Sequence, residues 1–135
     1  MNGQDDSEPA APLVLVVDDF QDNREMFAEF LAISGFRVAQ AANGREALER
    51  AFDLVPDAIL MDLSLPELDG WEATRRLKRD PRTSHIPVVA LTGHVLADHA
   101  REAKDAGCDG FLAKPCLPEV LVVELRRVLA AHGPR

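Results

Sequence analysis

Short runs of apolar residues alternate with longer stretches of mixed hydrophobic and polar residues along almost the whole chain. The short runs have no polar face, which is typical of parallel strands that are covered on both sides. We expect strands at residues 13–17, 36–41, 58–61, 86–91 and 109–113. Between the runs, apolar residues recur at helical spacing. Helices are therefore expected at 22–34, from Asn43, from Asp69, at 95–106 and at 118–131.

Residues that begin and end helices support these boundaries. Asp22 with Glu25, and Asn43 with Glu46, have the spacing of a capping box at a helix N-terminus. Gly35 is expected to end the first helix. The alternation of strands and helices then predicts a single doubly wound α/β domain with a parallel sheet, because right-handed crossovers place helices on both faces. The pattern alone does not fix the order of the strands.

Charged and hydroxyl side chains follow four of the apolar runs. Asp18 and Asp19 end the first run, Asp62 the third, Thr92 the fourth, and Lys114 the fifth. Ligands in open α/β sheets bind beyond the carboxyl ends of the strands, so these side chains are expected to meet at one edge of the sheet. Clustered carboxylates are costly unless a cation balances them. Their hard oxygen ligands favour Mg²⁺ over zinc.

This order of residues resembles the receiver domain of two-component response regulators, over roughly Pro12 to Leu129. The matching motifs are the Asp18-Asp19 pair, Asp62 within the segment 61–70, Thr92 within 90–92, and Lys114-Pro115. The resemblance implies a (βα)5 flavodoxin-like fold with strand order 2-1-3-4-5, in which the first and third strands are neighbours. It also implies a stand-alone regulator similar to the chemotaxis regulators.

The resemblance further implies a role for each candidate residue. Asp62 would accept a phosphoryl group from the phosphohistidine of a histidine kinase or histidine phosphotransfer protein, and Thr92 and Lys114 would complete the catalytic set. Mg²⁺ would be bound by Asp19, Asp62 and the backbone carbonyl of Ser64, with Asp18 acting mainly through water. The protein would promote its own phosphorylation and dephosphorylation without turning over an external substrate, so it is not expected to be an enzyme.

Output is expected from the face formed by helix 95–106, strand 109–113 and helix 118–131. Phe111 matches the aromatic residue that changes position in this family when Thr92 moves toward the phosphate. In the last helix, the spacing of Leu121, Leu125 and Val128 predicts the core face. Val120 and Val123 fall outside that stripe. We expect a downstream protein target, or a second copy of the chain in a homodimer, to dock there.

Composition restricts the other possibilities. A chain of 135 residues fits one domain, here 12–132, preceded by a polar tail at 1–11 that we expect to be disordered. The net charge of −8 argues against nucleic-acid binding. No apolar stretch could span a bilayer and no signal peptide is recognisable, which favours the cytoplasm. Cys108 and Cys116 are expected to be reduced thiols.

Three alternatives are compatible with the same fold. A flavodoxin-like flavin site would need a phosphate-binding loop after the first strand, where Asp18, Asp19 and Asp22 would repel phosphate. A flavodoxin-like aspartyl phosphatase would carry a second acid two residues after its nucleophile, and Ser64 stands there instead. A receiver module separated from a hybrid histidine kinase is the third alternative. The beginning and end of the sequence argue modestly against that alternative.

Overall fold

The computed structural model describes residues 11–63, 70–93, 101 and 104–132. Five parallel strands form one sheet in the order β2-β1-β3-β4-β5, as the resemblance predicts. The strands are β1 Leu13–Val17, β2 Arg37–Ala41, β3 Ala58–Asp62, β4 Val88–Thr92 and β5 Gly110–Ala113. The helices with defined bounds are α1 Gln21–Ile33, α2 Gly44–Leu54, α3 Gly70–Arg79 and α5 Pro118–His132. Residues 95–100, 102 and 103 of the expected fourth helix lie outside the described residues.

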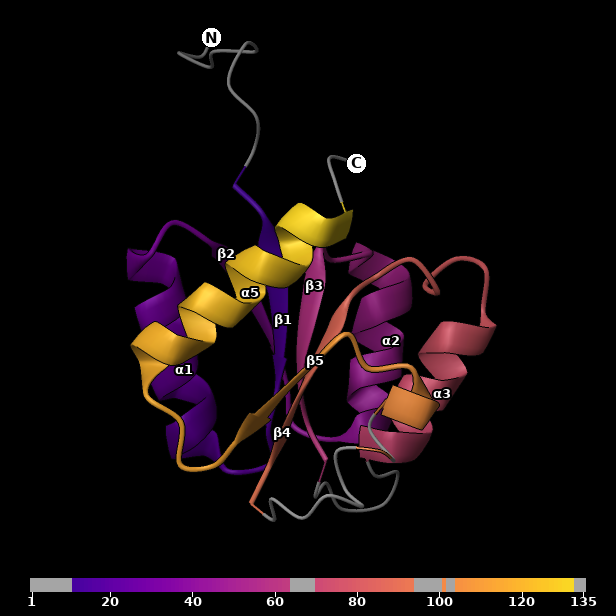
Figure 1. The fold of residues 1–135 in the computed structure, drawn as a ribbon, viewed down its shortest axis with the longest axis horizontal. Coiled ribbons are helices and arrows are strands. Elements are labelled where there is room, and N and C mark those ends of the chain that lie inside the picture. Colours follow the sequence, from indigo (N-terminus) through magenta and orange to yellow (C-terminus); the bar gives the residue numbers. More distant parts are fainter. Residues whose placement is uncertain (1–10, 64–69, 94–100, 102–103, 133–135) are drawn as a thin grey trace, which may run out of the picture.

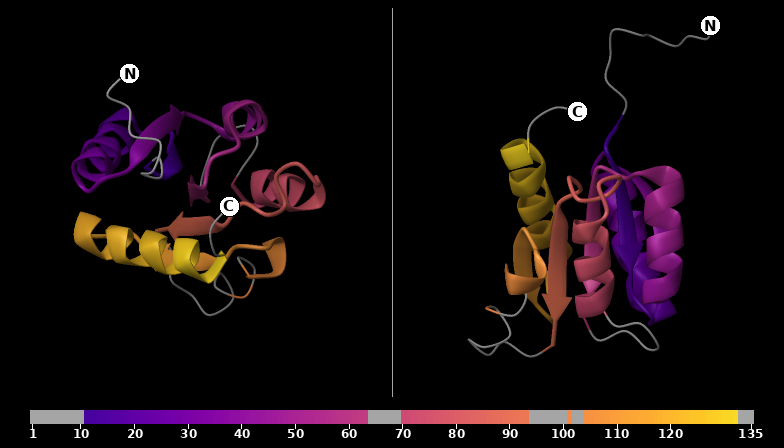
Figure 2. Two further views of the ribbon diagram at one scale, coloured as in Figure 1. Left: turned by 90° about the horizontal axis from the view of Figure 1, so that it is seen from above. Right: turned by 90° about the vertical axis from the view of Figure 1, so that its right-hand side faces the viewer.

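Helices cover both faces of the sheet (Figures 1 and 2). On one face, α1 and α5 pack on β1 and β3 through a cluster that includes Val16, Leu31 and Leu125. On the other face, α2 and α3 pack on the same strands through a cluster that includes Leu15 and Leu77. Strands β3 and β4 are fully buried. The continuous apolar runs of the sequence are therefore explained by burial on both sides.

The carboxyl ends of the strands all lie at the lower end of the molecule in Figure 1. The amino end of β1 and the carboxyl end of α5 lie at the opposite end (Figure 1). Because β1 and β3 are neighbours, their carboxyl ends bring together segments that are far apart in the sequence. This edge of the sheet is where the sequence predicts a site.

The predicted helix starts are only partly correct. Asn43 caps α2, since its Oδ1 accepts a hydrogen bond from the Glu46 N–H at 2.8 Å, and Glu46 Oε1 accepts one from Ala42 N at 2.9 Å. The capping box expected at Asp22 is wrong. The helix begins one residue earlier, after Phe20, and no side chain caps it.

Three strands begin later than expected, and the first of these is β2, which begins at Arg37 rather than Phe36. Strand β4 begins at Val88, two residues later than expected, and β5 begins at Gly110 rather than Asp109. The Asp109 side chain accepts a hydrogen bond from Val88 N at 2.8 Å and forms an ion pair with Lys78 at 2.9 Å. Asp109 therefore tethers the amino ends of both strands through its side chain.

The last helix follows the predicted pattern. Leu121, Leu125 and Val128 are buried, whereas Val120 and Val123 are 47% and 69% exposed. Among the described residues, no helix is long and apolar enough to cross a membrane. Both cysteines are free and partly buried. Apart from Ala11, the predicted N-terminal tail lies outside the described residues.

Candidate functional site

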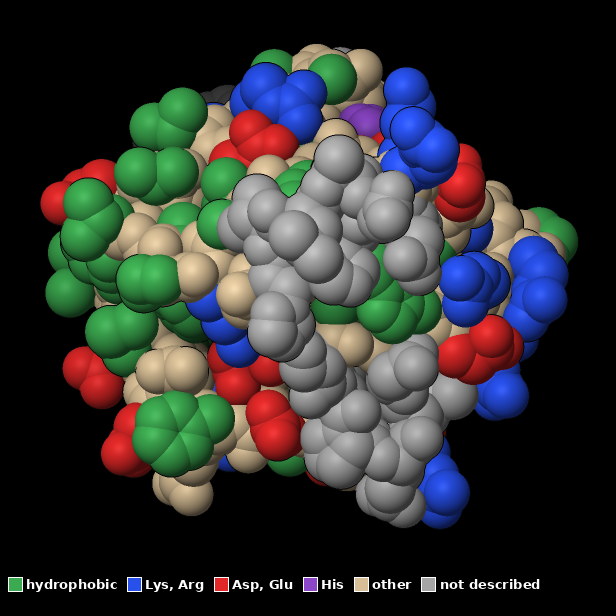
Figure 3. All heavy atoms as spheres, turned by 60° about the horizontal axis from the view of Figure 1, so that its bottom comes forward, with side chains coloured by type: hydrophobic (Ala, Val, Ile, Leu, Met, Phe, Trp, Pro, Cys, Tyr) green, Lys and Arg blue, Asp and Glu red, His purple; other side chains and the backbone are tan. Residues whose placement is uncertain are grey.

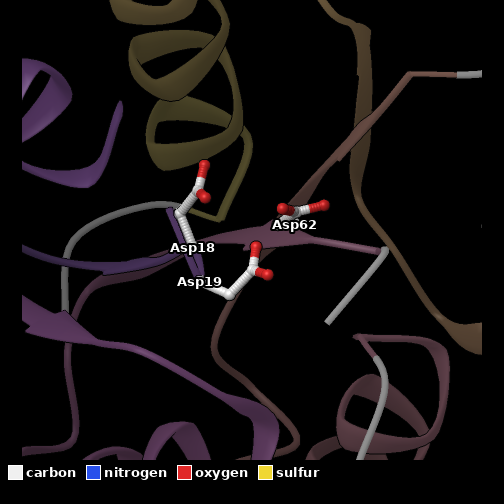
Figure 4. Close-up of side chains that lie close together, drawn as sticks. All are labelled: Asp18, Asp19 and Asp62. Atoms are coloured by element: carbon white, nitrogen blue, oxygen red, sulfur yellow. The ribbon is translucent and has the colours of Figure 1, made fainter. Parts of the chain in front are cut away.

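Three carboxylates meet at the carboxyl ends of β1 and β3. Val17 is paired with Met61 in the sheet, so the residues that follow them emerge side by side. Carboxylate oxygens of Asp18, Asp19 and Asp62 lie within 4.8 Å of one another (Figure 4). Asp18 and Asp62 are buried and Asp19 is exposed. The strand order therefore creates an acidic cluster that is open on one side.

Asp18 lies deepest in this cluster. Its Oδ1 accepts a hydrogen bond from Phe20 N at 2.9 Å, which shapes the turn into α1. Its Oδ2 is buried and accepts no hydrogen bond from the described residues. Burial raises the pKa of Asp18 above its usual value, and the charges of Asp62 and Asp19 act in the same direction. The Phe20 N–H and the Lys114 ammonium oppose this rise without cancelling it.

Lys114 supplies a positive charge beside the cluster. Its Nζ lies 2.9 Å from Asp62 Oδ2 and 3.6 Å from Asp18 Oδ2. Its backbone N–H donates to the Thr92 carbonyl at 2.7 Å, which anchors the residue at the end of β5. Burial lowers the pKa of Lys114, but its interactions with Asp62 and Asp18 outweigh burial, so the pKa is raised overall. Lys114 is therefore held in its charged form.

Thr92 is buried at the end of β4. Strand β4 lies between β3, which ends at Asp62, and β5, which Lys114 follows. Thr92 pairs with Ala113 of β5, and the adjacent Leu91 pairs with Asp62 of β3. The predicted residues Asp18, Asp19, Asp62, Thr92 and Lys114 thus all lie at one end of the sheet. Ser64 lies outside the described residues.

Two features of the site were not predicted from the sequence. Gly70, the first residue of α3, approaches the backbone of the Asp62 segment so closely that a Cβ there would collide with the Asp62 carbonyl oxygen. The Arg24 side chain donates to the Asp18 carbonyl at 2.9 Å and to Gln40 Oε1 at 3.1 Å. For Gly70, the only signal in the sequence is the Asp69-Gly70 pair at the expected start of a helix, and that signal is weak. For Arg24, nothing in the sequence pattern distinguishes it from a solvent-exposed arginine.

The donor set fits a hard divalent cation. Three carboxylates and one ammonium leave a formal charge of −2 at the site. All available donors are oxygens, which suits Mg²⁺. The buried Asp18 Oδ2, which lacks a hydrogen-bond donor among the described residues, is a costly arrangement that a cation or its bound water would relieve. Asp18, Asp19 and Asp62 are the described residues that could hold the ion.

Charged and hydrophobic side chains occupy different parts of the surface around the site. Figure 3 views the molecule with this end of the sheet turned forward and shows acidic side chains next to basic ones. Hydrophobic side chains gather on the left of that view, the side on which Figure 1 places α1 and α5. The exposed large apolar residues of α1, of α5 and of the positions just before each helix are Phe20, Met26, Ile33, Leu117, Val120 and Val123.

The chain is similar in sequence to a known protein family and to characterised regulators. Residues 14–126 match the family described as the response regulator receiver domain. The polar-differentiation response regulator DivK of Brucella anthropi is 37% identical over 102 residues, which cover 76% of this chain and 83% of DivK. The phosphate regulon transcriptional regulatory protein PhoB of Pseudomonas aeruginosa is 39% identical over 121 residues, 90% of this chain. That match spans only 53% of PhoB.

A solved structure extends the similarity to three dimensions. The receiver domain of the sensor histidine kinase PA1611 from Pseudomonas aeruginosa superposes with a TM-score of 0.83 at 34% identity. The superposition covers 90% of this chain and 99% of that domain. That structure holds a magnesium ion in its active site cleft.

Proposed function

The chain belongs to the response regulator receiver domain family, and from this premise we propose that it accepts a phosphoryl group onto Asp62 in a Mg²⁺-dependent reaction. Receiver domains are signalling modules of two-component systems, phosphorylated by histidine kinases, rather than classical enzymes. The observation that carries the proposal is the placement of the buried Asp62 carboxylate between two further carboxylates and the Lys114 ammonium.

In the proposed reaction, a carboxylate oxygen of Asp62 attacks the phosphorus of a phosphohistidine. A new O–P bond forms and the N–P bond of the donor breaks; the imidazole nitrogen leaves with the electron pair and takes up a proton. The product is an acyl phosphate on Asp62. Hydrolysis of this acyl phosphate by water would later return the free carboxylate and inorganic phosphate.

The neighbouring residues have distinct roles in this proposal. Bound Mg²⁺ would supply positive charge that offsets the repulsion between the carboxylates and the incoming phosphoryl oxygens. Asp19, Asp62 and the Ser64 carbonyl would hold the ion, with Asp18 acting through water. Lys114 would exchange its ion pair with Asp62 for one with a phosphoryl oxygen. The Thr92 hydroxyl would donate a hydrogen bond to another phosphoryl oxygen.

The donor must approach from the open side of the cluster. Asp62 is buried, so a phosphohistidine has to reach it past the residues that surround the site. A histidine kinase or histidine phosphotransfer protein is therefore proposed to cover this end of the sheet. We propose that the modification is read by a downstream protein target at the face of the expected helix 95–106, β5 and α5, or by a second copy of the chain in a homodimer.

The cellular location and the domain bounds are also part of the proposal. The chain is proposed to act in the cytoplasm, without binding nucleic acid itself or a membrane. Residues 12–132 are proposed as the receiver domain, preceded by a disordered tail. A receiver module of a hybrid kinase remains the alternative, since PA1611 carries a receiver domain of the same fold. An aspartyl phosphatase is less well supported, because the family match is to receivers.

The decisive experiment is phosphorylation with a small acyl-phosphate donor and Mg²⁺, followed by intact mass measurement. One added phosphoryl group is expected in the parent chain and none in Asp62→Asn. Asp53→Asn, which changes an exposed aspartate on α2, is the matched control and should label like the parent. Labelling of Asp62→Asn at the parent's level would overturn the assignment.

A further inference from the structure

The backbone of Asp18 lies where the pairing of β1 with β2 stops. The Asp18 N–H still donates to the Ala41 carbonyl at 3.1 Å, and Ala41 is the last residue of β2. The Asp18 carbonyl instead accepts a hydrogen bond from Arg24 Nη1 at 2.9 Å. The guanidinium therefore takes the place of a backbone donor at the point where the sheet ends.

The Arg24 side chain is itself held from both sides. Its backbone N–H donates to Phe20 O at 3.0 Å, so its Cα is fixed in the first turn of α1. Its Nε donates to the side-chain oxygen of Gln40, on β2, at 3.1 Å. One planar group thus joins α1, the end of β1 and the neighbouring strand β2. A guanidinium can make both bonds at once because its donors lie in a rigid fork.

We propose that Arg24 is a positioning residue that fixes the Asp18–Asp19 peptide and thereby sets the affinity of the acidic cluster for a divalent cation. The inference rests on the proposed function, since it deepens the role of the same site. The Asp18 carbonyl and the Asp19 N–H belong to one rigid peptide plane. Fixing that carbonyl therefore fixes the position of the Asp19 Cα, which lies in the same plane and from which the exposed side chain projects.

Asp19 depends on this support because its side chain has no hydrogen bond or ion pair with any of the described residues. Asp18 is held by burial and by the Phe20 N–H, and Asp62 by its strand and by Lys114. Asp19 lies on the exposed side of the cluster. Groups that orient a metal ligand without touching the metal typically change metal affinity by about 10- to 100-fold when they are replaced.

Two substitutions distinguish a positioning role of Arg24 from an effect of its positive charge. Arg24→Lys keeps the positive charge but has a single ammonium, which cannot reproduce the fork. Gln40→Met keeps Arg24 intact and removes only the oxygen that orients it. Arg37→Lys is the matched control, since Arg37 also donates from its Nε to a backbone carbonyl, that of Ala11 at 2.8 Å, at the other end of β2.

The test measures Mg²⁺ affinity by calorimetric titration and, in EDTA, the thermal midpoint and amide hydrogen exchange of residues 18–20. We expect Arg24→Lys to weaken Mg²⁺ binding by about tenfold and Gln40→Met to weaken it in the same direction. Amide exchange at residues 18–20 should be faster in both variants before any metal is added. Arg37→Lys should match the parent in Mg²⁺ affinity.

The outcomes distinguish the inference from the proposed function. Parent-like Mg²⁺ affinity in Arg24→Lys overturns the positioning role, because that variant keeps the positive charge of Arg24 and lacks only its fork of donors. A lower thermal midpoint with unchanged Mg²⁺ affinity would show that Arg24 is merely structural, which also overturns the inference. A parent chain that binds no Mg²⁺ and takes up no phosphoryl group overturns the proposed function, and this inference with it.

Discussion

Lys114 and Asp62 form an ion pair of 2.9 Å although β4 lies between β3, which ends at Asp62, and β5, which Lys114 follows. The lysine side chain reaches across the end of β4 from the loop that follows β5. Its ammonium also lies 3.6 Å from Asp18 Oδ2, so one positive charge faces two buried carboxylates. The electrostatics of the site therefore depend on a contact between residues that are 52 positions apart.

Replacing Lys114 by Gln should destabilise the metal-free protein. The change leaves Asp62 and Asp18 without their cationic partner, and loss of a charged hydrogen bond at such a site costs about 2 kcal/mol. Urea unfolding in EDTA measures the difference, with exposed Lys104→Gln as the control. Added Mg²⁺ should restore more stability to Lys114→Gln than to the parent. Equal stability of Lys114→Gln and the parent in EDTA would contradict the expectation.

Replacing Asp18 by Asn should stabilise the metal-free protein near neutral pH. Burial raises the pKa of Asp18 in the folded state above its usual value. A carboxyl with a raised folded-state pKa contributes most to stability below its unfolded pKa, and that contribution is lost as the pH rises through the folded value. The Asn side chain has no such titration and keeps an oxygen for the Phe20 N–H.

The gap in unfolding free energy between Asp18→Asn and the parent should therefore widen as the pH rises through the raised pKa of Asp18, and then level off. Chemical denaturation in EDTA at a series of pH values from about 4 to 8 tests this. A gap that does not change with pH would argue against ionised Asp18 as its source.

Replacing Gly70 by Ala should displace α3 from the segment that follows β3. A Cβ at Gly70 would collide with the Asp62 carbonyl oxygen and would lie 2.8 Å from the Leu63 Cα, and neither backbone atom can move without shifting β3. We expect a loss of about 2 kcal/mol in stability, the typical order for overpacking, together with slower phosphorylation. Gly93→Ala is the control, because nothing lies within 4 Å of a Cβ there. Normal stability and labelling in Gly70→Ala would show that the approach is not needed.

Replacing Val120 and Val123 together by Glu should abolish phosphorylation-dependent association while Asp62 still accepts a phosphoryl group. Both valines are exposed on α5, away from its buried stripe. Pull-down of a candidate target and light scattering, with and without a phosphoryl mimic, measure binding and self-association. The double variant Ala130→Glu/Ala131→Glu, two exposed changes on the same helix, controls for the added negative charge. Should every such association survive in the double variant, the docking surface lies elsewhere.

The parts of this site that depend on strand ends could be predicted from the sequence. Asp18, Asp62 and Lys114 each follow an apolar run, and parallel strands must place such residues at one edge. The strand order was obtained from the resemblance, because the alternation of strands and helices is compatible with several orders. The sheet has the order so inferred.

Contacts that depend on side-chain reach could not be predicted. Asp22 has the spacing of a helix cap, yet the carboxylate of Asp18, two residues before Phe20, takes the N–H at the start of the helix. Arg24 and Gln40 are 16 positions apart, and only the packing of α1 against β2 brings them together. Gly70 is required because its Cα lies against the backbone of Asp62 and Leu63, and no local sequence pattern predicts that close approach.

The strand that precedes Lys114 is the least protected part of this arrangement. Strand β5 has four residues, lies at an edge of the sheet, and has no fully buried residue, whereas every residue of β4 beside it is buried. Edge segments of this kind open at lower free energy than the core. Detachment of β5 would carry the ammonium away and leave the carboxylates to repel one another while β1, β3 and β4 stay paired. A cation binds the carboxylates more favourably once the ammonium has left, so cation binding and the opening of this edge are thermodynamically linked. Ligand occupancy can therefore be followed as reduced hydrogen-exchange protection of β5, at some distance from the acidic side chains themselves.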